Sequence, residues 1–178
     1  MNLPEVFQHC PRCGARRDGP PANPFHCAAC GHQQYFNPAS AVAAILLGPD
    51  GRALFLRRAR DPGKGLLGLP GGFVDMGETA EIALRREIRE EVNLEVGALE
   101  FLCSGVNSYF YKEVTYPVLD LFFVARAEST DGIAALDGVE SYLWLEPAKA
   151  NPAEFAFGSN AEAVRCFNER RCLSRRDG

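Results

Sequence analysis

The feature that most constrains this 178-residue chain is a glycine-rich loop followed directly by an acidic, amphipathic segment. Leu84, Ile88 and Val92 recur every four residues, which predicts a helix from Thr79 to Val92 with one side buried. Thr79 is a residue type that caps helix starts. Residues 78–95 contain six acids and three arginines, so they carry −3 of the chain's net charge of −4.

Three of these acids gather at one edge of the predicted helix. At about 100° per residue, Glu87, Glu90 and Glu91 share a narrow arc beside the apolar stripe. Glu87 and Glu91 are like charges four residues apart, which destabilises a helix, and Arg86 with Glu90 is the one obvious compensating pair. A solvated, salt-bridged face explains this pattern poorly. Divalent cations such as Mg²⁺ explain it better, because they bind carboxylates and attract phosphates.

The same segment resembles the Nudix box. It reads Gly-x5-Glu-x7-Arg-Glu-Ile-x-Glu-Glu-x-x-Leu from Gly72 to Leu94, after the lead-in Leu69-Pro70-Gly71-Gly72. Two positions depart from the family pattern. Asn93 replaces a glycine that ends the helix, where Asn is the next best residue for a left-handed conformation. Leu67 stands where tryptophan is common, a change that affects packing more than chemistry.

The resemblance implies an α/β fold, namely an α/β/α sandwich with a mixed sheet over residues 39–178. It also implies hydrolysis of a nucleoside diphosphate linked to another moiety, with catalytic Mg²⁺ or Mn²⁺. The implied metal ligands are Glu87, Glu90, Glu91 and the backbone carbonyl of Gly71 or Gly72. Arg86 would orient a glutamate, and Glu78 would support the junction of loop and helix. The two glycines would also let the backbone approach the substrate's phosphates.

The general base is not specified by the resemblance, because its position varies within the family. Glu113, Asp137 and Glu140 are candidates, and Glu140 is favoured among them. Tyr109 and Tyr111 are candidates for stacking on a nucleobase or nicotinamide. Alternating aromatic residues are equally typical of a strand that packs into a core.

The remaining elements follow from alternation, turn residues and capping patterns. The final helix is predicted from the capping-box pattern Ser159-Asn160-Ala161-Glu162 to about Cys172. The predicted strands are Ala41–Leu47, Ala53–Arg57, Leu99–Leu102, Val106–Tyr111, Val118–Ala125 and Ser141–Leu145.

Two cysteine pairs predict a zinc ribbon in residues 1–38. Cys10-x2-Cys13 and Cys27-x2-Cys30 are separated by 13 residues, and a glycine follows each pair. Four thiolates suit a structural zinc ion with no open coordination position. About 38 residues cannot build a sufficient core alone, so zinc is expected to fold this segment. A mixed site, in which His9, His26 or His32 replaces a cysteine, is the alternative.

Composition separates the two regions further. All three histidines lie in the first 32 residues, so residues 33–178 must work without imidazole, which excludes Ser-His-Asp and Cys-His machinery there. With 19 basic and 23 acidic residues, no global positive field attracts nucleic acid or membranes. No secretory signal or membrane span is visible, which predicts a cytoplasmic protein in which paired cysteines bind metal.

A zinc ribbon followed by a Nudix domain is similar to the NADH pyrophosphatase branch. That branch carries Ser-Gln-Pro-Trp-Pro-Phe-Pro after the box, whereas this chain has residues 103–114 in that place, without the signature. The expected substrates are therefore NADH, ADP-ribose or a similar dinucleotide or nucleotide sugar, which would give a nucleoside monophosphate and a phosphorylated second product.

Two other functions stay open from the sequence. One is non-catalytic binding of a nucleotide or nucleic acid, which the complete acidic triad disfavours. The other is hydrolysis of an RNA cap, with the RNA held by the ribbon and by Arg165, Arg170, Arg171, Arg175 and Arg176. For the ribbon, packing or homodimerisation is favoured over nucleic-acid binding by Arg12, Arg16 and Arg17, because four zinc-bound thiolates carry a net charge of about −2.

Overall fold

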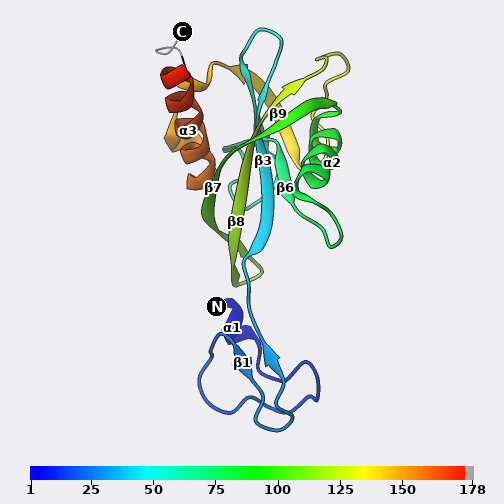
Figure 1. Ribbon diagram of the computed structural model, residues 1–178, viewed down its shortest axis with the longest axis vertical. Coiled ribbons are helices and arrows are strands. Elements are labelled where there is room, and N and C mark those ends of the chain that lie inside the picture. The colour runs from blue at the N-terminus through cyan, green and yellow to red at the C-terminus, as the bar shows by residue number, and fades with distance from the viewer. Residues whose placement is uncertain (175–178) are drawn as a thin grey trace. The chain divides into compact units, whose positions relative to one another are not determined.

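The computed structural model describes residues 1–174, and these form two compact units (Figure 1). The smaller unit, here called the ribbon unit, contains Met1–Ala39 together with Ser108–Val118. The larger unit contains Ser40–Asn107 and the described residues from Leu119 onward.

The larger unit is built on one seven-stranded sheet. Its central order is β5-β4-β3-β8-β7, with β6 paired to β3 and β9 paired to β4. The strands are β3 (Ala39–Leu47), β4 (Ala53–Arg58), β5 (Leu67–Gly68), β6 (Gly71–Phe73), β7 (Val96–Tyr111), β8 (Val114–Ala127) and β9 (Val139–Leu145). The helices are α2 (Ala80–Val92) and α3 (Gly158–Ser174), with short 3-10 turns at Pro147–Lys149 and Pro152–Glu154.

Two separate apolar cores hold the helices to the sheet. The predicted stripe on α2 is fully buried against sheet residues such as Val42 and Leu46. Residues of α3, among them Val164 and Phe167, pack with Phe122 in a second core. Figure 1 shows α2 and α3 on either side of the sheet. The predicted α/β/α sandwich is therefore confirmed.

The strands predicted at 99–102 and 106–111 are confirmed, but they are parts of one longer strand, β7, which pairs with β8. One local prediction was wrong. The final helix begins at Gly158, so Ser159 lies inside it, and the Ser159 hydroxyl does not form the expected capping bond. The Ser159 side chain is buried, and the Glu162 carboxylate instead binds Arg165 within the helix.

The ribbon unit has little regular structure. It contains α1 (Leu3–Val6) and one antiparallel pair, β1 (Phe25–His26) with β2 (Gln33–Gln34). The end of the β7–β8 hairpin belongs to this unit, although the sequence placed it with the larger domain. Main-chain bonds explain the difference, because Thr115 N–H donates to the Met1 carbonyl and the Met1 amine donates to the Glu113 carbonyl, both at 2.8 Å.

No helix within residues 1–174 is both long and apolar enough to cross a membrane.

Candidate active site

The glycine-rich loop and α2 meet at a well-defined junction. The Thr79 hydroxyl accepts the Ile82 N–H at 3.3 Å, so Thr79 caps α2 as predicted. At the other end Asn93 is left-handed (φ 55°, ψ 40°), and its N–H donates to the Arg89 carbonyl at 2.9 Å. Asn93 therefore ends the helix as the glycine of the Nudix pattern would.

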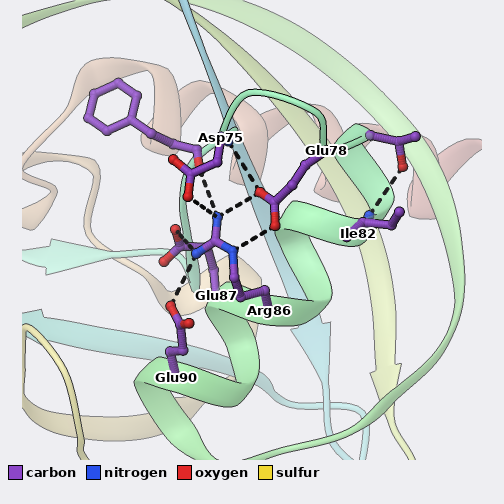
Figure 2. Close-up of polar contacts among 8 residues, drawn as sticks. Asp75, Glu78, Ile82, Arg86, Glu87 and Glu90 are labelled. Atoms are coloured by element: carbon purple, nitrogen blue, oxygen red, sulfur yellow. Dashed lines mark hydrogen bonds and ion pairs between the residues drawn. The ribbon is translucent and has the colours of Figure 1, made fainter.

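Arg86 lies at the centre of the carboxylates, as Figure 2 shows. Its Nε and Nη2 donate to the two oxygens of Glu78 at 2.8 and 2.9 Å, a bidentate pair. Its Nη1 donates to Glu87 at 2.8 Å and to Glu90 at 3.1 Å, and its Nη2 also donates to the Phe73 carbonyl at 3.1 Å. One guanidinium thus ties the loop to two successive acids of α2.

Glu91 is held from the loop rather than by Arg86. The Gly71 N–H donates to Glu91 Oε2 at 2.9 Å, which leaves Oε1 for another partner. Gly71 has φ +144°, and a Cβ there would lie 2.1 Å from the Val42 carbonyl oxygen. A Cβ on Gly72 would lie 2.5 Å from the Glu87 carboxyl group. Gly71 therefore requires glycine, and a side chain at Gly72 would displace the Glu87 carboxyl group.

The carboxylates of the site differ in the direction of their pKa shifts. The hydrogen bonds from Arg86 lower the pKa of Glu78. Burial raises the pKa of Glu87, and it raises the pKa of Glu91 to about 8 despite the bond from Gly71. The Glu87 charge adds to the shift at Glu91. Glu87 and Glu91 therefore form a buried carboxylate pair in which ionisation of Glu91 is disfavoured, an environment that a bound cation would relieve.

A second loop closes the carboxyl end of α2. The Leu136 N–H donates to the Glu91 carbonyl at 2.9 Å, and the Asp137 N–H donates to the Glu90 carbonyl at 3.3 Å. Asp137 lies near enough to Glu91 to raise its pKa, and it forms an ion pair with Arg60 at 2.9 Å. Of the three candidate bases, the structure thus brings Asp137 close to the carboxylates.

Arg58 and Arg60 are residues of this site that sequence reasoning missed. The positive charge of Arg58 lowers the pKa of Glu91, and Arg60 holds Asp137. The available signal was the run of basic residues that directly follows the apolar part of β4. The position of these arginines near the carboxylates depends on which strand lies beside α2. Spacing along the chain does not show this.

The other predicted residues lie elsewhere. Glu140 is exposed on β9. Tyr109 and Tyr111 lie in the part of β7 that belongs to the ribbon unit, with ring centroids 6.5 Å apart, and Glu113 lies at the end of the same hairpin. Of the five arginines predicted to hold RNA, Arg175 and Arg176 lie outside the described residues, while Arg165 and Arg170 form ion pairs with glutamates.

The four ribbon cysteines form a compact thiol cluster. The Sγ atoms of Cys10 and Cys30 are 3.8 Å apart, those of Cys13 and Cys27 are 3.7 Å apart, and all four lie within 4.8 Å of one another. A tetrahedral zinc ion with Zn–S bonds of about 2.3 Å requires sulfurs about 3.8 Å apart. Two of the sulfur–sulfur distances thus match this value, and the four thiols together fit a zinc site.

The carboxylates are arranged less closely than the thiols. Among residues 1–174, the thiols are the one set of three or more ligand-type side chains whose ligand atoms come within 4.8 Å of each other. Arg86 Nη1 lies between Glu87 and Glu90 and donates to both carboxylates. The fit to hard cations rests instead on oxygen donors, on excess negative charge and on the close approach of the glycine backbone.

Comparison with known proteins identifies the class that this fold and site define. The NUDIX domain family model matches residues 37–165, and the chain therefore belongs to the Nudix family. Enzymes of this family use divalent metal ions. A crystal structure of a Nudix hydrolase from Nitrosomonas europaea has a TM-score of 0.73 with 22% identity and covers 93% of each chain, which shows a shared fold.

Curated relatives match over shorter regions. An ADP-ribose pyrophosphatase of Methanocaldococcus jannaschii is 46% identical over 35% of this chain and 37% of its own length. Human mitochondrial NAD(P)H pyrophosphatase NUDT13 is 41% identical over 39% of this chain and 20% of its length. The NAD-capped RNA hydrolase NudC of Pseudomonas aeruginosa is 34% identical over 53% of this chain and 34% of its length. The matches thus span no more than about two fifths of these relatives.

Proposed function

We propose that this protein is a divalent-metal-dependent pyrophosphohydrolase that acts on a nucleoside diphosphate linked to another moiety. The observation that carries the proposal is the arrangement of the glycine loop and α2. Gly71, a position that tolerates no side chain, binds Glu91, Gly72 lies against the Glu87 carboxyl group, and Arg86 organises the neighbouring acids. Membership of the Nudix family and the pyrophosphatases among the relatives support this reading.

Each residue of the site has a distinct proposed task. Glu87, Glu90 and Glu91 would hold Mg²⁺ or Mn²⁺, together with the carbonyl of Gly71 or Gly72. When bound, such ions polarise a phosphate and lower the pKa of an attacking water. Arg86 keeps Glu87 and Glu90 oriented through fixed hydrogen bonds, and Glu78 anchors Arg86 in turn.

Removing a proton from the attacking water requires a carboxylate, since histidine is absent beyond position 32. Asp137 fits this task better than the initially favoured Glu140, because the loop that carries Asp137 is bonded to the end of α2. Glu140 remains the second candidate, and exchanging each for the amide separates the two.

The proposed substrates are NADH, ADP-ribose or a related dinucleotide or nucleotide sugar, which would give a nucleoside monophosphate and a phosphorylated second product. The activities named for two relatives, an ADP-ribose pyrophosphatase and an NAD(P)H pyrophosphatase, support this class. Tyr109 and Tyr111, whose rings lie near each other, are the proposed stacking surface for a base. The four thiols would hold a structural zinc ion, as suits a reducing cytoplasm, and homodimerisation through the ribbon is a further proposal.

Hydrolysis of NAD-capped RNA is a second candidate, favoured by the likeness to NudC. It shares the chemistry of the first candidate, because the same pyrophosphate bond is cleaved. It differs in requiring a surface for RNA, which the net charge of −4 does not favour.

The test is product analysis with purified, zinc-loaded protein. NADH, ADP-ribose, diadenosine polyphosphates, dNTPs and NAD-capped RNA are each incubated with Mg²⁺ or Mn²⁺, beside the Glu91→Gln variant. We expect one substrate class to give a nucleoside monophosphate, and we expect the variant to lose activity by about 10³-fold, or about 4 kcal/mol in barrier. Failure of every substrate with both metals would replace the proposal with non-catalytic binding.

A further inference from the structure

The segment between β5 and β6 must be held in place for Gly71 and Gly72 to meet α2. Leu67 and Gly68 pair with β4, whereas Gly71 and Gly72 pair with β3. Leu69 and Pro70 therefore cross from one strand to the next, where the sheet ladder cannot bond all of their main-chain groups. The Pro70 carbonyl accepts the Ala44 N–H at 2.9 Å, which accounts for one of these groups.

A second of these main-chain groups is bound by a residue far along the chain. The Leu69 N–H donates to the side-chain Oδ1 of Asn160 at 2.9 Å, across 91 positions of sequence. Both residues are more than nine-tenths buried. A buried amide N–H without a hydrogen-bond acceptor destabilises the folded state. Asn160 Oδ1 therefore restricts where the Leu69 N–H can lie.

The start of α3 is in turn fixed to the same segment. Leu67 forms a parallel bridge with Phe155, and the Ala156 N–H donates to the Leu67 carbonyl at 2.9 Å. The Asn160 N–H closes a turn by donating to the Phe157 carbonyl at 3.1 Å. Asn160 is therefore a fixed point beside the crossing rather than a mobile side chain.

The segment of Leu69 and Pro70 is joined to Glu91 through Gly71. Gly71 follows Leu69 by two residues, and the intervening Pro70 has a restricted backbone. A displacement of Leu69 is thus passed to the Gly71 N–H, which holds Glu91 Oε2 at 2.9 Å.

We propose that Asn160 is a positioning residue of the candidate active site: through the Leu69 N–H it sets the place of the Gly71 N–H, and so the orientation of the Glu91 carboxylate. This inference rests on the proposed function for its catalytic consequence, but its structural part is independent of turnover. Asn160 does not touch the proposed metal or substrate.

The experiment compares three variants of the full, zinc-loaded protein. Asn160→Leu has a similar size and no acceptor, whereas Asn160→Asp keeps an acceptor at the same position. Val164→Ala is the control: Val164 is also buried on α3, and its truncation weakens the packing of that helix but keeps the Asn160 acceptor for the Leu69 N–H. Should Asn160→Leu not fold, Asn160→Ala removes the acceptor without adding volume and replaces it.

Two readouts need no substrate. Amide hydrogen exchange by NMR is expected to be at least about tenfold faster at Leu69 in Asn160→Leu, with a shifted Gly71 amide resonance. The affinity for Mn²⁺, followed by paramagnetic resonance, is expected to fall about tenfold, as is typical when a residue supporting a metal ligand is lost. Asn160→Asp should restore both properties, and Val164→Ala should leave both unchanged.

The catalytic readout separates this inference from the proposed function. With an active substrate, kcat should fall about 10- to 100-fold in Asn160→Leu with little change in KM. Wild-type levels of Leu69 protection and Mn²⁺ affinity in Asn160→Leu, or equal losses in Val164→Ala, would overturn the inference. If the wild-type protein cleaves nothing, the proposed function fails, and the exchange and Mn²⁺ measurements still decide the role of Asn160.

Discussion

The thiol cluster and the carboxylate cluster are supported in opposite ways. The thiols belong to a unit whose main apolar cluster is formed by the buried residues Cys10, Phe25, Cys27 and Phe36, so two of these four residues are themselves proposed zinc ligands. The carboxylates project from a helix whose other side is fully buried in a large core shared with the sheet. In the ribbon unit, the proposed zinc would supply stability that the small apolar core cannot. In the larger unit, the apolar core stabilises α2 and the sheet without a metal.

We infer from this difference that the geometry of the ligands alone does not indicate the role of a metal ion. The thiols are closely spaced and saturate a tetrahedral ion, which suits structure. The acids are more loosely spaced, partly paired with Arg86 and partly uncompensated, which suits an ion that is exchanged and that meets a substrate. The predictions below test this contrast.

The largest expected effect is on the ribbon unit. Removing zinc with a chelator, or making Cys27→Ser, should unfold residues 1–39, because zinc contributes about 10–16 kcal/mol in comparable small domains. The amide resonances of that segment should collapse toward random-coil positions, while those of α2 and α3 keep their dispersion. Cys172→Ser, an exposed cysteine on α3, is the matched control. Unfolding of both units together would contradict the inference that only the ribbon unit depends on a metal for its fold.

A smaller effect, on activity, is expected when Arg86, which orients the carboxylates, is replaced. Arg86→Lys keeps the charge but not the fork that binds Glu78, Glu87 and Glu90 together, so activity should fall about 10- to 100-fold with the melting temperature nearly unchanged. Arg89→Lys is the control, because Arg89 forms a comparable bidentate pair with Glu95 at the exposed side of the same helix. Equal losses in both variants would assign the effect to helix stability.

The smallest effect concerns pH in the absence of metal. The folded protein holds the Glu91 proton up to about pH 8, whereas an unfolded glutamate releases it near 4.3. Between these values the folded state binds more protons, so its stability falls as the pH rises, by at most about 1.4 kcal/mol per pH unit. Glu91→Gln should remove this slope, which thermal melts in chelator at pH 5 and 8.5 would measure.

The exposed Glu140→Gln serves as the control for these melts, and it should shift the melting temperature equally at both pH values. A pH slope that persists in Glu91→Gln would show that another group is responsible. Addition of Mg²⁺ should stabilise the wild-type protein at pH 8.5 through binding to the folded state, and should do so much less in the variant.

Much of the candidate site was predictable because it is local in the chain. The helix from Thr79 to Val92, its cap and its left-handed end at Asn93 all follow from short-range rules and agree with the structure. The grouping of Glu87, Glu90 and Glu91 follows from helical periodicity. The two cysteine pairs are likewise local, since the two-residue gap in each pair directs both sulfurs toward one point.

The departures from expectation arose where local rules compete with packing. The Ser159–Glu162 pattern matches a capping box, but the start of α3 is pinned by Leu67 and Leu69, and Ser159 is buried as a result. The tip of the β7–β8 hairpin joins the ribbon unit through main-chain bonds to Met1, which no side-chain pattern encodes.

The sequence by itself determined the helix that carries Glu87, Glu90 and Glu91 and the spacing of the thiols, because each depends on residues within one helix or turn, and its resemblance to the Nudix box indicated the class of fold. Only the tertiary structure decided how those acids are held. The pairing of Arg86 with Glu78, the bond from Gly71 to Glu91 and the bond from Leu69 to Asn160 join residues 8, 20 and 91 positions apart. Such contacts depend on which strands and helices pack together, and spacing along the chain does not specify that.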